Sequence, residues 1–263
     1  MTKARSTQVC LEATNFYHCY CRVVRSGWLI GNDPKTNKNY DHRRQWIEDR
    51  IMFLADIFAI DIAAYAVMSN HYHIVLAIDK AQAENWDVLE VITRWHRLYK
   101  GTLLTNKFIK GEPLSEVELD AVAIKAEIWR KRLFEIGWLM RNINEPIARQ
   151  ANSEDGCKGR FWESRYKSQA LLDEKAVLSC MAYVDLNPIR AKMHRQLETS
   201  AHTSIKKRCK KASEVSDPNA LTNQAKGLMN FAGRPKKDMP KGIPCRLIAY
   251  LELVEWTGRQ IKA

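Results

Sequence analysis

Apolar residues recur along the first part of the chain with two spacings, one typical of strands and the other of helices. Residues 60–68 and 71–78 are rich in β-branched residues and favour strands, and residues 16–30 favour a strand or hairpin. Residues 42–59 place apolar side chains three or four positions apart, which predicts an amphipathic helix. A tight turn at Ser69-Asn70 joins the second strand to the third.

The pattern then becomes mainly helical. Residues 85–99 and 128–150 have helical spacing, and Pro146 breaks or kinks the second of these helices. Residues 101–127 lie between them and predict a loop followed by a separate helix, which we interpret as a helical insertion. The segment after residue 157 predicts a loop that leads into a further strand.

Residues 173–188 predict a helix that Asp173 caps and that Pro188 ends. A tail follows over residues 197–263, with a last amphipathic helix near residues 245–256. Three or four strands mixed with helices predict an α+β fold, in which helices pack on one antiparallel sheet. We therefore expect a main domain over residues 1–196 and a basic C-terminal extension over residues 197–263.

Composition narrows the class of protein. With 263 residues, 46% of them hydrophobic, the chain can form one large domain with or without a small appendage. It has no membrane-length apolar run and no apolar secretory signal, so we expect a cytoplasmic protein with no membrane partner. Seven cysteines without a CxxC pair argue against a disulfide framework or structural zinc. Cys19 and Cys21 can in principle bind metal, but we expect small core residues.

Charge points to the partner. The formal net charge is +12, which favours a polyanionic partner such as nucleic acid over a merely basic soluble protein. Two basic runs, at residues 206–211 and 234–237, either bind phosphates or form solvated linkers. We expect Arg43 and Arg44, at a helix start, to lie on the solvated surface.

Two histidines open the strand at residues 71–78. Because side chains alternate along a strand, His71 and His73 share a face and lie roughly 6.5–7 Å apart at the backbone. Two neutral imidazoles can hold one divalent metal ion if a third ligand comes from elsewhere. The alternative is two ordinary histidines near a turn. A histidine-triad hydrolase is excluded, because the next position on this face is Val75.

Tyr183 and Asn187 form a second candidate pair. They lie four residues apart on a predicted helix, and so on the same face. A tyrosine can act as a covalent nucleophile, and a nearby amide oxygen can complete a metal shell. The alternative is a half-buried core tyrosine and a polar residue near a helix end. Tyr166 is a rival nucleophile, but no amide residue follows it by four positions.

Cations alternate with aromatic rings before the last predicted strand, as in proteins that hold single-stranded DNA by phosphate pairing and base stacking. The alternative is a strand whose aromatic residues belong to the core. The candidate DNA contacts are Lys158, Arg160, Trp162, Arg165 and Lys167, together with Arg190 just after the helix that carries Tyr183.

Three segments in this order, SNHYHIVL, GRFWESRYKSQ and AYVDLNPIRA, resemble the single-tyrosine HUH transposases, and most of all the REP-associated tyrosine transposases. The resemblance covers roughly residues 14 to 195. It departs from the family at Tyr72, which is aromatic where an aliphatic residue is usual. Asn187 also stands where many relatives have the longer glutamine. The insertion and the tail are further additions, which leave DNA specificity and oligomeric state open.

The resemblance implies a ferredoxin-like sheet and a metal-dependent DNA nicking-and-joining enzyme. His71, His73 and Asn187 would bind Mg²⁺ or Mn²⁺, and Tyr183 would attack a phosphodiester of single-stranded or hairpin DNA. The products would be a 5′-phosphotyrosine and a free 3′-hydroxyl that can rejoin DNA, with the protein acting as a monomer or homodimer. The alternatives are a non-catalytic DNA-binding relative, or a metal-dependent hydrolase in which Tyr183 is structural.

Overall fold

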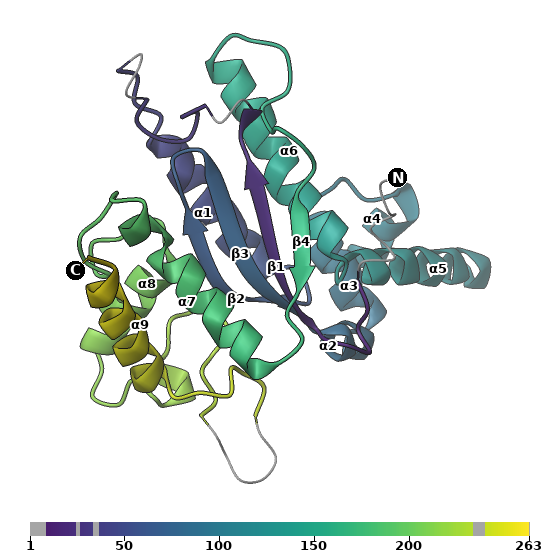
Figure 1. The fold of residues 1–263 in the computed structure, drawn as a ribbon. Coiled ribbons are helices and arrows are strands. Elements are labelled where there is room, and N and C mark those ends of the chain that lie inside the picture. The colour runs from purple at the N-terminus through teal and green to yellow at the C-terminus, as the bar shows by residue number, and fades with distance from the viewer. Residues whose placement is uncertain (1–8, 25–26, 34–36, 234–239, 263) are drawn as a thin grey trace.

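The computed structural model describes residues 9–24, 27–33, 37–233 and 240–262 (Figure 1). Within these ranges, no helix is both long and apolar enough to cross a bilayer. In chain order the elements are β1 (Phe16–Arg22), α1 (His42–Ala55), β2 (Ile60–Val67), β3 (His71–Ile78), α2 (Lys80–Asn85), α3 (Val88–His96), α4 (Leu103–Ile109), α5 (Glu116–Arg132), α6 (Ile136–Glu154), β4 (Lys167–Ala170), α7 (Glu174–Arg190), α8 (Ser204–Ser213), the 3-10 turn η3 (Leu221–Asn223) and α9 (Leu247–Lys262).

The four strands form one antiparallel sheet in the order β2-β3-β1-β4. Together with α1 between β1 and β2, and α6 before β4, this is the ferredoxin-like arrangement, so the predicted α+β fold is confirmed. The register places Tyr20 of β1 opposite His73 on one side and Lys167 on the other. The strand β1 therefore separates the histidine strand from the segment that carries the basic and aromatic residues.

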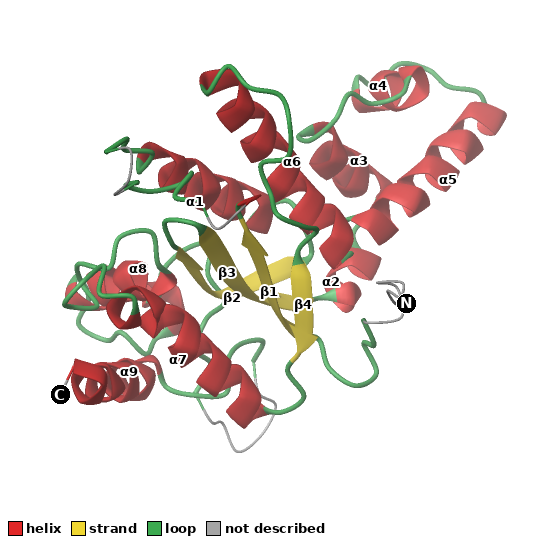
Figure 2. Ribbon diagram, turned by 45° about the horizontal axis from the view of Figure 1, so that its top comes forward, coloured by secondary structure: helices red, strands yellow, loops and turns green. Residues whose placement is uncertain are grey.

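The two faces of the sheet are covered by different helices, with α1 and α6 on one face and α7 on the other (Figure 2). Tyr72, Ile74 and Leu76 of β3 belong to the first core, whereas Val75 and Ala77 belong to the second. Alternation along β3 therefore sorts side chains as the sequence predicts. Cys19 and Cys21 are buried in the first core, which confirms that they are core residues.

The C-terminal helices α8 and α9 pack beside α7 (Figure 2). Their shared centre is the buried carboxylate of Asp185 on α7, which accepts hydrogen bonds from Ser204 Oγ at 2.6 Å and Tyr250 Oη at 2.5 Å. Burial raises the pKa of Asp185. The basic run 206–211 lies on α8, where Arg208 is fully buried and donates to two backbone carbonyls. This run is therefore no solvated linker, and the run at 234–237 lies outside the described residues.

Several predicted helix boundaries are wrong. The helix expected over residues 85–99 is present as α3 but is shorter, and the separate helix α2 precedes it. The helix α5 extends to Arg132 before α6 begins. The helix α6 continues through Pro146. Asp173 does cap α7, accepting from the backbone N–H of Ala176 at 2.7 Å. Pro188 does not end α7, because a proline in the last turn removes only one backbone donor.

Arg43 and Arg44 are buried, which contradicts their expected place on the surface. Arg43 Nε donates to Glu154 at 2.8 Å, and its Nη atoms donate to Asp155. Arg44 pairs with Asp41 at 2.5 Å. These carboxylates compensate the cost of burying a guanidinium, and two of them lie more than a hundred residues away at the end of α6.

Candidate active site

His71 and His73 lie at the start of β3 on the face that α7 covers. Their ring centroids are 4.9 Å apart, and His73 is only 6% exposed. Burial lowers the pKa of His71 to about 4 and that of His73 to about 2, and the nearby Arg22 adds to both shifts. Both imidazoles are therefore neutral at neutral pH, which is the form that binds metal ions.

The nitrogen atoms of the two histidines have different partners. Nδ1 of His71 lies 2.6 Å from Oδ1 of Asn70, so it donates there and leaves Nε2 as the acceptor. Nδ1 of His73 is also engaged, while its Nε2 is buried without a hydrogen-bond partner. A buried nitrogen with no partner is costly, and a bound metal ion removes that cost.

Asn187 supplies a second buried polar atom without a partner, its Nδ2. A 180° turn of the amide exchanges Nδ2 for Oδ1 with little change of shape, and Oδ1 is a metal ligand. Within the described part of the chain, no three His, Cys, Asp or Glu residues are placed to hold a metal ion. A third protein ligand would therefore be of another type, and two imidazoles with one amide oxygen are a donor set that divalent ions accept.

His18 on β1 is a site residue that the sequence reasoning missed. Its Nε2 lies 2.9 Å from Nδ1 of His73, and the two rings stack with centroids 5.1 Å apart. If His73 presents Nε2 to a metal ion, its Nδ1 carries the proton and donates it to His18. Burial lowers the pKa of His18, which keeps it a neutral acceptor. The only signal in the sequence is that His18 and Tyr20 share a strand face, and the pairing of β1 with β3 is needed to use it.

Tyr183 lies on α7 facing the histidines of the same chain. Its ring centroid is 5.8 Å from that of His73, and the residue is 42% exposed. The guanidinium of Arg190 lies over this ring, 5.0 Å from its centroid, in a cation–π contact. The rival Tyr166 is only 7% exposed. An exposed phenol beside a cation and a candidate metal site can act as a nucleophile.

The predicted DNA contacts, which we call the basic edge, lie on the loop before β4, at the start of β4 and at the end of α7. Lys158, Arg160, Arg165, Lys167 and Arg190 are exposed, and Trp162 is half-buried. Nζ of Lys167 lies 5.7 Å from the ring centroid of Tyr20. The ring centroids of Tyr20 and His73 are 5.6 Å apart. Through these ring contacts, Lys167 of the basic edge is connected to the histidines. Phe161 and Tyr166 are buried, so these two rings serve the core instead.

Comparison with known proteins gives one distant likeness. No family model and no curated protein matches the chain. A solved structure of a REP-associated tyrosine transposase bound to a REP hairpin is 12% identical, with a TM-score of 0.45. The alignment covers 81% of this chain and 87% of that one. This likeness is too distant to assign an activity or a site residue.

Proposed function

We propose that this protein is a metal-dependent enzyme that cleaves and rejoins single-stranded or hairpin DNA through a covalent 5′-phosphotyrosine on Tyr183. The observation that carries the proposal is the exposed phenol of Tyr183, whose ring centroid is 5.8 Å from that of His73. Nε2 of that histidine is buried without a partner. A nucleophile and a candidate metal site therefore lie side by side.

His71, His73 and Asn187 would hold the metal ion. When bound, a divalent ion there polarises the scissile phosphate and neutralises the charge that builds up during the displacement. Mg²⁺ and Mn²⁺ both suit phosphate chemistry, but Mg²⁺ is held mainly by oxygen ligands. The two nitrogen donors therefore make Mn²⁺ the first ion to use in assays.

Tyr183 performs the covalent step. Its Oη attacks phosphorus, forming a new O–P bond while the bond from phosphorus to the 3′ oxygen breaks. The phenol loses its proton to solvent, and the departing 3′ oxygen takes one up. Arg190 stabilises the phenolate as it forms. Attack by a 3′-hydroxyl on the phosphotyrosine reverses these changes, so rejoining needs no nucleotide cofactor.

The basic edge would hold the substrate. Exposed cations on the loop before β4 can pair with phosphates, and the net charge of +12 favours a polyanion over a neutral substrate. The preference for hairpins rests on the family resemblance in sequence. The proposal is tested against two alternatives. One is a non-catalytic DNA-binding protein, and the other is a hydrolase in which Tyr183 is structural.

The test is a covalent trapping assay. Hairpin DNAs with single-stranded flanks are labelled at the 3′ end, because the strand on the 3′ side of the nick stays on the protein. They are incubated with Mn²⁺ and resolved on a denaturing protein gel. The proposal predicts a labelled adduct that disappears with EDTA and in Tyr183→Phe but persists in Tyr166→Phe. Cleavage without an adduct would instead indicate the hydrolase, and binding without cleavage the DNA-binding protein.

A further inference from the structure

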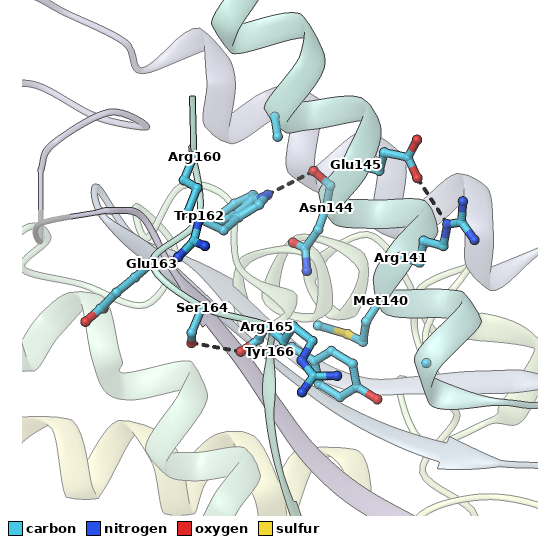
Figure 3. Close-up of a pocket in the computed structure, with 12 residues that line it drawn as sticks. Met140, Arg141, Asn144, Glu145, Arg160, Trp162, Glu163, Ser164, Arg165 and Tyr166 are labelled. Carbon is cyan, nitrogen blue, oxygen red and sulfur yellow. Dashed lines mark hydrogen bonds and ion pairs between the residues drawn. The ribbon is translucent and has the colours of Figure 1, made fainter. Parts of the chain in front are cut away.

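A cavity of about 580 Å³ lies away from the histidines, between α6 and the loop that leads into β4 (Figure 3). Gly137, Met140 and Asn144 of α6 line one wall, and Trp162 and Tyr166 of the loop line the other. A cavity of this size can hold a small organic group, since ligand sites in proteins occupy roughly 300–1,000 Å³. The proposed catalytic residues do not line it.

Gly137 keeps this cavity open. It is the second residue of α6, and a Cβ built on it would meet only Tyr166 Oη, at 3.8 Å. That is an ordinary contact, so neither packing nor a positive φ requires glycine here. Because glycine is a poor helix former, its presence costs helix stability and gains space. The missing side chain at this position therefore leaves the space open.

The cavity lining combines apolar surface with a fixed amide. Asn144 is held in place because Tyr72 Oη donates to its Oδ1 at 2.6 Å, and Trp162 Nε1 donates to its backbone carbonyl at 2.9 Å. With Oδ1 engaged, Nδ2 is the donor that Asn144 can offer to an occupant, and it points between the two walls (Figure 3). A flat group with an acceptor on its edge suits these walls.

Two cations stand at the rim, Arg160 and Arg165. Neither has an ion pair among the residues that the structure describes, whereas Arg141 on the opposite wall is paired with Glu145. A second carboxylate, that of Glu163, also lines the cavity. Aromatic and apolar walls, an amide donor and free guanidinium groups are the means by which proteins hold an unpaired base and its flanking phosphates. With three guanidinium groups against two carboxylates, the net positive charge of the lining and its apolar walls both favour an unpaired base with its phosphates.

We infer that this cavity binds one unpaired base of the DNA strand that Tyr183 cleaves. The strand would pass from the cavity along β4, where Lys167 lies over Tyr20 and Tyr20 lies beside His73. The inference rests on the proposed function, because the base in the cavity and the phosphate that Tyr183 attacks belong to the same DNA strand. It adds a site at which the presence of a base affects binding.

The test fills the cavity without disturbing the fold. Gly137→Leu adds a side chain into the space, while Gly137→Ala adds one methyl group and leaves most of the volume. Both changes favour the helix, so the melting temperature of each variant should equal or exceed that of the wild type. The probes are fluorescent strands of about 12 nucleotides, one of thymidine and one with abasic sugars throughout. Binding is measured by anisotropy in EDTA, so that no cleavage takes place.

We expect Gly137→Leu to weaken binding of the thymidine strand by about tenfold, because one base loses its stacking site. Its affinity for the abasic strand should stay at the wild-type value, and Gly137→Ala should resemble the wild type on both. Equal weakening on both strands, or no change on either, overturns the cavity site alone. If the wild type binds neither strand, both the cavity site and the proposed single-stranded DNA substrate are wrong.

Discussion

The contact between His18 and His73 leads to a prediction about metal affinity. In His18→Leu the side chain keeps its bulk but loses the acceptor that lies 2.9 Å from Nδ1 of His73. The ring of His73 is then free to turn, and its Nδ1–H becomes a buried donor without a partner. Removing such an outer hydrogen bond typically costs 10–100-fold in metal affinity. We expect a loss of about tenfold or more.

The assay is direct binding of Mn²⁺ to the DNA-free protein by titration calorimetry, so that the result does not depend on catalysis. The matched control is His18→Gln, whose Oε1 can accept the same hydrogen bond. It should recover most of the lost affinity, whereas a purely steric role for His18 would favour the leucine. A Mn²⁺ affinity within twofold of wild type in His18→Leu would show that His18 does not support His73 as a metal ligand.

Three further predictions concern stability and rate. The pKa of Glu48 is about 2 instead of 4.5, because hydrogen bonds from His202 and other partners outweigh its burial. The ionised Glu48 therefore stabilises the fold by about 3 kcal/mol above pH 4.5, and this stabilisation is lost as the pH falls towards 2. The difference in unfolding free energy between the wild type and Glu48→Gln, measured by urea titration, should narrow over the same range. Tyr250→Phe, which deprives Asp185 of one hydrogen bond, should lower the unfolding free energy by about 1–3 kcal/mol in a single transition; a separate melting step for α9 would contradict this. Arg190→Gln should slow adduct formation up to about tenfold in a time course, and an unchanged rate would remove its role.

Local patterns were enough to predict the strand that carries the histidines. Alternation from His71 to Ile78 fixes which side chains face α7, and the structure has the strand with these bounds. The spacing of Tyr183 and Asn187 likewise needs only the helical repeat. Features that depend on one element and its period are visible in a single sequence.

Contacts between distant segments were not predictable in this way. Arg43 and Arg208 look like surface cations, because the groups that permit their burial lie on α6 and on the backbone of other segments. His18 gains its role only when β1 pairs with β3. No local pattern encodes that register, so the sequence indicated three candidate metal ligands and a candidate nucleophile but not His18.

The central claim is that Tyr183 forms a covalent bond to DNA. The most direct measurement is peptide mapping by mass spectrometry, after the wild-type protein has reacted with hairpin DNA in Mn²⁺ and a nuclease has trimmed the attached strand. We expect a nucleotide joined through phosphate to the peptide that contains Tyr183, and none when EDTA is present. A nucleotide on the peptide that contains Tyr166, or cleaved DNA with no modified peptide, would contradict it.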